Sequence, residues 1–350
     1  MSRILQCWRQ LQRSLFPGLE AELGPQSPVH GRIMVVLDWL DLGRFVAAPC
    51  GRGRPPACRQ ALAAAFVAKA VLNAQSTRAL IDRLQADRVL RRLCGFDATR
   101  RLPSEATFSN AFAEFSASDF PSRLHEALVK ELYGDRLENK IVGHVSRDST
   151  DIHVRAKVRR KRKKKTRRQK GPKGKKRRVH RQLSMSLEEM LGDLPIAVDC
   201  GTKRGHSWKG LKLHLDVADG DIPLSAIMTS ASVHDSQVAI PLEEMTSRRV
   251  TSLYSLMDSA YDAKEIREYA ARKAKVAIIE PLNWVGQTAT LDPAERRRFG
   301  QRTSVERVFS QLKDGFGARH IRVRAPPKIW AHLMFAVLAL TATQTVRVFG

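Results

Sequence analysis

Three acidic residues that lie far apart in the sequence constrain the fold of this 350-residue chain more than any other feature. Asp148 and Asp258 each follow a short run with the composition of a β-strand. Glu306 lies in residues 304–316, where apolar residues recur at helical spacing. A fold that uses all three acids together therefore needs two strands that end at the aspartates and a helix that carries the glutamate.

These residue types suit a pair of divalent metal ions held over a phosphodiester. Mg²⁺ prefers carboxylate oxygens and water, and Mn²⁺ is a possible substitute. We predict that the catalytic residues and metal ligands are the same three acids: Asp148 bridges two ions, and Asp258 and Glu306 each hold one. Arg302 and Lys313 share a helical stripe with Glu306 and are predicted to grip phosphate. This chemistry indicates an enzyme that cuts and joins DNA.

Each acid alone has an ordinary explanation. An aspartate after a strand is usually a turn or cap residue, and a helical glutamate is usually solvated. Asp151 also competes with Asp148 for the role of first acid, because the two positions point to opposite sides of a strand. Asp148 is preferred because it directly follows the strand-like run.

The segment around Glu306 resembles the DDE transposases of bacterial insertion sequences. Their C-terminal element reads Tyr-x2-Arg-x3-Glu-x6-Lys, and the chain matches it at Arg302, Glu306 and Lys313. Phe299 replaces the tyrosine and removes one hydroxyl. Similar segments occur at 146–150, around the first acid, and at 208–214 and 230–236, between the first and second acids. The resemblance runs from about residue 51 to about residue 346.

The resemblance implies a transposase that binds the ends of its own insertion sequence, cleaves the DNA and joins the 3′ ends to target DNA. A homodimer on paired DNA ends is expected of the family. Two other functions remain open: a structure-directed nuclease with an RNase H-like fold, and a non-catalytic DNA-binding derivative of a transposase. The intact set of three acids argues against the second.

The order of predicted elements indicates an α/β catalytic domain with an RNase H-like fold at residues 136–350. A strand meander is followed by alternating helices and strands, and then by the helix of the last acid. Strands are predicted at residues 141–147, 211–217, 223–230, 253–257 and 275–279, with a hairpin turn at 218–221.

The preceding residues, 51–135, are predicted to form an all-α, helix-turn-helix-like DNA-binding domain, although an ordinary helical bundle has the same pattern. Helices are expected at residues 59–73, 76–84 and 87–93, and another after Ser104 as its cap. Arg52 and Arg54 lie in the Gly/Pro-rich turn before them and are candidate phosphate contacts. The role of residues 1–50 is not evident.

The formal net charge of +26 favours a polyanionic partner. Residues 155–181 hold 18 Lys and Arg and no acid, and we predict that they form a basic arm, inserted between the first two strands, that binds DNA backbone. The candidate contacts within the arm are Lys163, Lys164, Arg167, Arg168, Lys175 and Arg177. Because no lipidation signal accompanies the charge, double-stranded DNA is the expected partner and a membrane is not.

Five cysteines without CxxC spacing argue against a disulfide framework and against a zinc site. No signal peptide is recognisable, and the apolar run at 333–340 is far shorter than the roughly 20 residues of a membrane span. We therefore expect a cytoplasmic protein associated with the nucleoid.

Overall fold

The computed structural model describes residues 27–46, 57–97, 99–137, 141–155, 179–203, 206–282 and 290–349. Several candidate DNA contacts lie outside these residues: Arg52, Arg54, Lys163, Lys164, Arg167, Arg168, Lys175 and Arg177. Most of the basic arm and more than half of residues 1–50 lie outside them as well. The part of the chain that the structure describes forms two compact units, each described below by itself.

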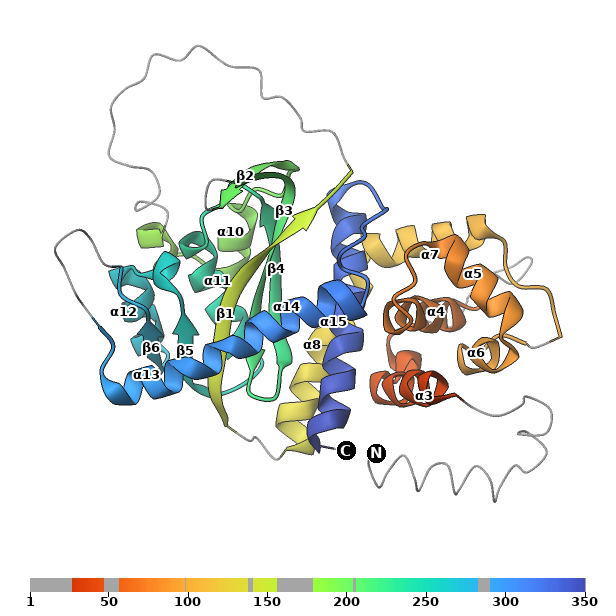
Figure 1. Ribbon diagram of the computed structural model, residues 1–350, viewed down its shortest axis with the longest axis horizontal. Coiled ribbons are helices and arrows are strands. Elements are labelled where there is room, and N and C mark those ends of the chain that lie inside the picture. The colour runs from red at the N-terminus through yellow and green to blue at the C-terminus, as the bar shows by residue number, and fades with distance from the viewer. Residues whose placement is uncertain are drawn as a thin grey trace, which may run out of the picture. The chain divides into compact units, whose positions relative to one another are not determined.

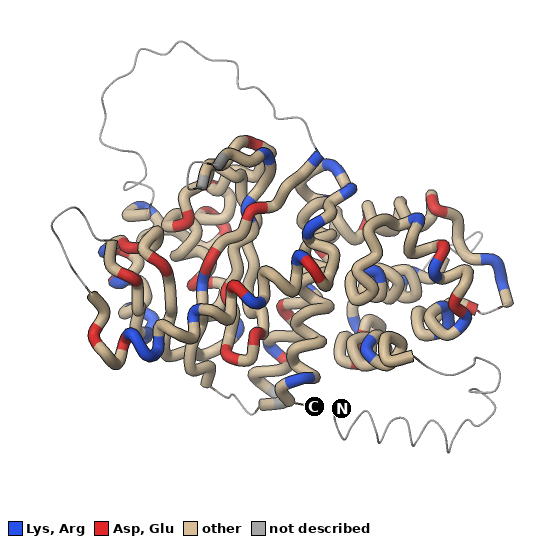
Figure 2. Tube along the Cα trace, viewed as in Figure 1, with Lys and Arg blue, Asp and Glu red and all other residues tan. Residues whose placement is uncertain are grey.

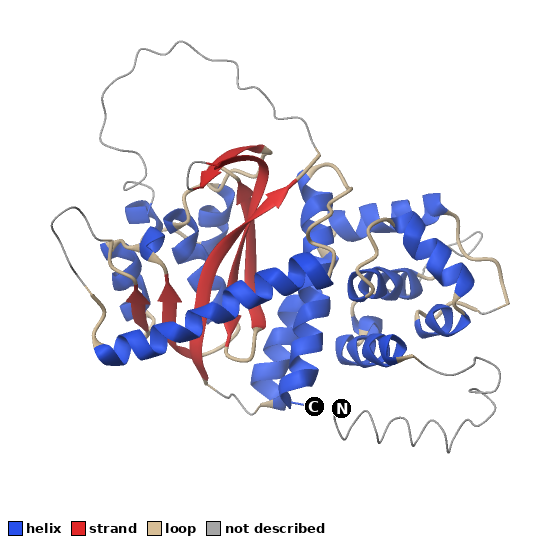
Figure 3. Ribbon diagram, viewed as in Figure 1, coloured by secondary structure: helices blue, strands red, loops and turns tan. Residues whose placement is uncertain are grey.

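The second unit, Val129–Phe309, is built on one mixed sheet (Figures 1 and 3). The strand order is β2-β3-β1-β5-β6, and β4 also pairs with β3, over residues 211–218 of that strand. The strands are β1 (Val142–His153), β2 (Asp199–Lys203), β3 (His206–Ala218), β4 (Ile222–Ser230), β5 (Ser252–Met257) and β6 (Val276–Ile279). β1 is antiparallel to β3 and parallel to β5, so it lies where the meander meets the parallel half of the sheet.

The predicted hairpin turn connects β3 to β4. Gly220 and Asp221 both have positive φ values, 83° and 63°, which a tight reversal between antiparallel strands requires. The nearly buried Asp221 carboxylate accepts hydrogen bonds from the guanidinium of Arg307. This ion pair ties the hairpin to the helix that carries the third acid.

Helices cover both faces of this sheet (Figure 1). The helices on one face are α10 (Leu187–Gly192), α11 (Ser236–Ser247) and α12 (Lys264–Arg272), which enclose an apolar core against the strands. The elements on the other are α13 (Pro293–Phe299), the 3-10 turn η4 (Gly300–Arg302) and the start of α14 (Thr303–Gly315). Neighbouring β1 residues show the two faces: Ser146 donates to the carbonyl of Gln301 in η4, whereas Arg147 contacts Glu243 of α11. This mixed sheet with flanking helices fits the predicted RNase H-like fold.

The first unit is helical and combines the described residues up to Leu128 with those from Ser310 onward. Its helices are α3 (Pro28–Leu40), α4 (Arg59–Val71), α5 (Thr77–Ala86), α6 (Arg88–Leu93), α7 (Glu105–Ala117), most of α8 (Phe120–Glu131) and α15 (Pro326–Phe349). Ser104 caps α7 by accepting from the amide of Thr107, as predicted.

The end of the chain belongs to the first unit because α15 packs against α3, α4 and α7. Phe335 of α15 lies against the rings of Phe66 in α4 and Phe112 in α7. All of 136–350 was predicted to form one catalytic domain, whereas residues from Ser310 onward group with the N-terminal helices. The long-range packing of an apolar helix decides this grouping, and the functional domain boundaries stay a prediction.

α15 is long and apolar enough to cross a membrane by length and composition. Within its most apolar stretch, however, 78% of the residues are buried inside the protein. A mostly buried helix of this kind is typical of a protein core, so α15 is weak evidence for a membrane span.

Candidate active site

The three predicted acids come together around one arginine, Arg302. Its Nη2 lies 3.1 Å from Oδ2 of Asp148 and 3.6 Å from Oδ2 of Asp258, and its Nη1 lies 2.8 Å from Oε1 of Glu306. Asp148 and Asp258 are 110 residues apart in the sequence. The sheet and α14 bring all three carboxylates within reach of one guanidinium.

Sheet register explains why the two aspartates meet. In the parallel pair of β1 and β5, Ser146 lies opposite Leu256. Asp148 and Asp258 each follow two residues later, so both side chains leave the same region of the sheet in the same direction. Asp258 directly follows β5, as predicted, and its carboxylate caps the next turn by accepting from the amide of Ala260.

Asp148 does not lie at a strand end, as the sequence analysis expected. β1 continues to His153, so Asp148 lies in its interior, paired opposite Leu215 of β3. The strand continues because the polar residues after Asp148 still pair with β3 over the length of the meander. The rival Asp151 lies on the alternate face of the strand and forms an ion pair with His153.

Arg302 is held between attraction to the acids and loss of solvent. Burial disfavours its charge, but the carboxylates of Asp148, Asp258 and Glu306 outweigh burial and raise the pKa of Arg302 above its ordinary value. Solvent reaches the three acids to different degrees: 12% of the Asp148 side chain is exposed, 30% of Asp258 and 57% of Glu306. The carboxylate cluster is therefore open on the side of Glu306.

The chemistry of the three predicted acids fits a hard divalent cation such as Mg²⁺, because all three offer carboxylate oxygens and none is a soft donor. In the described residues, no group of three or more His, Cys, Asp or Glu side chains is close enough together to hold a metal ion. Arg302 supplies the positive charge between the acids instead. A metal ion at these carboxylates would have to displace its guanidinium.

Tyr261 is a neighbour of the acids that the sequence analysis missed. Its side chain is fully buried, and its hydroxyl has no hydrogen-bond partner among the described residues. Burial, together with the charges of Asp235, Asp148 and Asp258, raises the pKa of Tyr261 well above its ordinary value. A polar group left unsatisfied beside acids is a recurrent feature of functional sites. Its signal in the sequence was its place three residues after Asp258.

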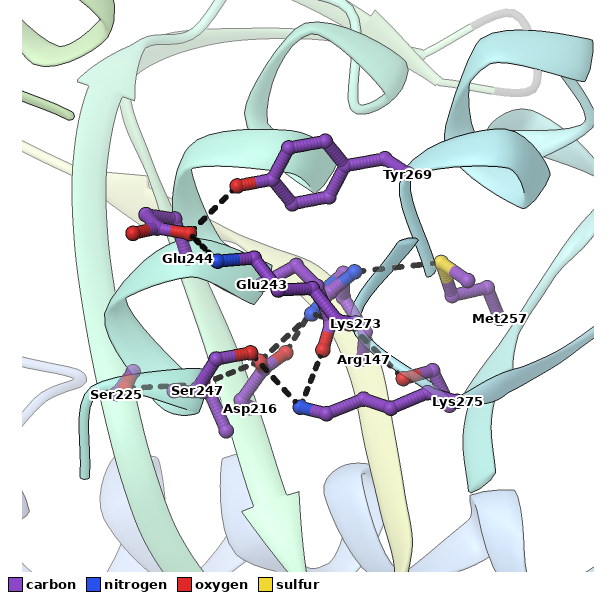
Figure 4. Close-up of polar contacts among 12 residues, drawn as sticks. Arg147, Asp216, Ser225, Glu243, Glu244, Ser247, Met257, Tyr269, Lys273 and Lys275 are labelled. Atoms are coloured by element: carbon purple, nitrogen blue, oxygen red, sulfur yellow. Dashed lines mark hydrogen bonds and ion pairs between the residues drawn. The ribbon is translucent and has the colours of Figure 1, made fainter. Parts of the chain in front are cut away.

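A second arginine, Arg147, anchors the strand of Asp148 from the opposite face of the sheet (Figure 4). Its guanidinium makes a bidentate contact to Asp216 at 2.7 Å and reaches Glu243 at 2.9 Å. Lys275 donates to the other oxygen of Glu243 at 2.6 Å, and Thr246 donates to Asp216 at 2.6 Å. We call these five residues the Arg147 cluster.

The Arg147 cluster is closed to solvent, and each of its charged groups has an oppositely charged partner. Only 1% of the Arg147 side chain is exposed, and none of Asp216. Burial alone would raise the pKa of Glu243, but Arg147 and Lys275 hold it well below its ordinary value. The cluster joins β1, β3, α11 and the residue before β6. It therefore holds β1, the strand that carries Asp148, in place against its neighbours. A charged residue adjacent to Asp148 in a strand was the available sequence signal, because alternation directs its side chain into the core.

Asp235 immediately precedes α11. Its side chain makes no capping bond. It accepts instead from the hydroxyl of Ser149 and the ammonium of Lys212, both at 3.0 Å. His214 lies beside it and is neutral, because burial lowers the pKa of His214 to about 4. Asp235 therefore links α11 to β1 and β3.

The charges of the described residues are mixed rather than uniformly basic. Figure 2 shows acidic and basic positions interspersed along the strands and helices. Lys313, the second predicted phosphate contact, lies on α14 seven residues after Glu306 but belongs to the first unit.

Two family models match the chain. Residues 143–342 match the family described as transposase DDE domain, which covers more than half of the sequence and all three acids. Residues 21–114 match a family described as transposase domain (DUF772). A search of the curated proteins finds no match.

Proposed function

Because the chain belongs to the transposase DDE domain family, we propose that it cleaves DNA at the ends of its own insertion sequence and joins the 3′ ends to target DNA. The family establishes a transposase in general. The observation that carries the specific proposal is the approach of Asp148, Asp258 and Glu306 to one guanidinium.

We assign Asp148, Asp258 and Glu306 as the ligands of two divalent metal ions, with Mg²⁺ as the natural cofactor and Mn²⁺ as a substitute. When bound, such ions activate a water or a 3′-hydroxyl and stabilise the leaving oxygen of the phosphodiester. The protein's contribution is to hold two carboxylates on the sheet and one on α14 at a single place. Their mutual repulsion is a cost that Arg302 offsets.

Arg302 would act twice in this scheme. Without metal it neutralises the acids, and when displaced it has a guanidinium free to bind phosphate in a bidentate manner. Lys313 would bind phosphate further along α14, as would the basic arm at 155–181 and Arg52 and Arg54. These contacts fit a protein that works on double-stranded DNA, and a homodimer on paired ends is part of the proposal.

The test is a strand-transfer assay with DNA that carries the element's ends, in Mg²⁺. Asp148→Asn removes a metal ligand at constant shape, and Asp151→Asn is the matched control three residues away on the same strand. We expect the first variant to bind DNA and lose cleavage, and the control to keep both. Activity lost in Asp151→Asn and kept in Asp148→Asn would overturn the assignment. Cleavage without strand transfer by the unaltered protein would favour a structure-directed nuclease.

A further inference from the structure

Lys69 is a buried cation in the first unit that the proposed function does not use. It lies in the last turn of α4, and only 9% of its surface is exposed. Among the residues that the structure describes, its ammonium has no hydrogen-bond or ion-pair partner. Burial accordingly lowers the pKa of Lys69 to about 8. The ammonium has little contact with water and no carboxylate beside it, so the position is better suited to a bound anion than to an empty core.

The Lys69 side chain lines a small pocket within the first unit that is partly open to solvent. Phe66, Phe112 and Phe335 form its apolar part. His332, another lining residue, donates from Nε2 to the carbonyl of Gly317. Burial and then the charge of Lys69 lower the pKa of His332 to about 4. The Lys69 ammonium is therefore close enough to influence His332, which is neutral at pH 7 and adds no positive charge to the pocket.

The N-terminus of α5 opens onto the same pocket through Thr77, its first residue. The Ser76 cap accepts from the amide of Ala79, and the amides before Ala79 have no partner within the helix. Those amides and the helix dipole favour an anion. Arg322 adds a second cation nearby, since its Nη2 donates to the side chain of Gln75 in the turn before α5.

We propose that this pocket binds a backbone phosphate of DNA, with the Lys69 ammonium and the N-terminus of α5 donating to its oxygens. α4 and α5 are joined by the short turn at 72–76, an arrangement in which helix termini commonly contact the DNA backbone. The strong net positive charge favours a polyanion over an acidic peptide. The inference rests on the proposed function, because it requires that the chain bind DNA.

A phosphate contact positions the protein without reading sequence. Losing it should weaken binding to end-containing and random duplexes alike, and lower the slope of log affinity against log salt by about 0.9. A charge-assisted bond of this kind corresponds to about a tenfold loss of affinity. This pattern separates the pocket from a base-reading site, whose loss would change preference rather than slope.

The first experiment compares Lys69→Met with Lys264→Met in the full chain. Methionine keeps an unbranched apolar stem, so Lys69→Met should melt no lower than the parent while its salt slope falls by about 0.9. Lys264 is exposed on α12 and paired with Glu268, so its variant should keep the parent's slope. A Lys69→Met slope equal to the parent's overturns the pocket inference. Failure of the parent to bind duplex DNA at all would instead defeat the proposed function.

A second measurement uses the parent protein and does not depend on how a variant folds. Duplex DNA should protect Lys69 from acetylation, read by mass spectrometry, whereas Lys264 should stay reactive. Inorganic phosphate at matched ionic strength is the arm for a free anion. Protection by inorganic phosphate but not by duplex DNA would show a free-anion site and overturn the assignment to DNA. Equal reactivity of Lys69 with and without DNA would also overturn it.

Discussion

Two arginines on opposite faces of the same sheet hold carboxylates in opposite ways. Arg147 is sealed in the core, and each of its acids has a further donor in Lys275 or Thr246. Arg302 lies among three acids that remain partly open to solvent. A saturated buried cluster has one stable arrangement, whereas an unsaturated and accessible one can exchange its cation. The difference teaches that ion pairs of similar length can serve structure at one place and function at another.

The largest expected effect tests the functional half of this comparison. Asp258→Asn and Glu306→Gln should each lower the rate of DNA cleavage by roughly 10³-fold or more, because each removes charge stabilisation from the reacting phosphodiester. Single-turnover cleavage in Mg²⁺ measures the rate, and a duplex-binding titration serves as control. A cleavage rate within a factor of ten of the parent's would remove that acid from the site.

The structural half predicts a loss of stability instead. Arg147→Met leaves Asp216 and Glu243 buried without their main cation, which should lower the free energy of unfolding by about 3–5 kcal/mol. Arg302→Met should change it by about 1 kcal/mol or less, since its partners can be solvated. Urea unfolding of the two variants makes the comparison. Similar losses in both would contradict the distinction between the clusters.

The loss of unfolding free energy at low pH should depend on the Arg147 cluster. The pKa of Glu243 is depressed in the fold, so the unfolded chain takes up its proton first as pH falls. The contribution of this carboxylate is present above its unfolded pKa of about 4.5 and is lost as pH falls toward its folded value. Unfolding free energies between pH 5 and about 2 should therefore fall less steeply in Glu243→Gln than in the parent. Parallel curves would mean that Glu243 does not dominate this limb.

The smallest expected effect is a gain in Mg²⁺ affinity. If Arg302 competes with metal for the acids, Arg302→Met should bind Mg²⁺ more tightly than the parent, by about tenfold, which is an ordinary coupling free energy between two sites. Calorimetric titration of the variant and the parent measures this. Strand transfer should nevertheless decline, because a phosphate contact is lost. Weaker Mg²⁺ binding in the variant would show that Arg302 supports the metal site rather than competing for it.

Local patterns carried much of this prediction. Helical spacing identified α4, α5 and α6 to within a few residues, and the cap at Ser104 marked the start of α7. The spacing around Glu306 identified the helix of the third acid, and the run before Asp258 identified β5. Caps and periodicity can be read from sequence because they depend on residues within a few positions of each other.

The sequence by itself determined the order of helices and strands and the family resemblance, and it singled out the three acids as candidates. Only the tertiary structure decided that Asp148 lies inside a strand, that Arg302 lies among the acids, and that residues from 310 onward join the N-terminal helices. Arg147 meets Asp216 across 69 positions of sequence, and Arg302 meets Asp148 across 154. Such pairs depend on strand register and helix packing, and local sequence patterns do not encode which distant side chain those will bring into contact.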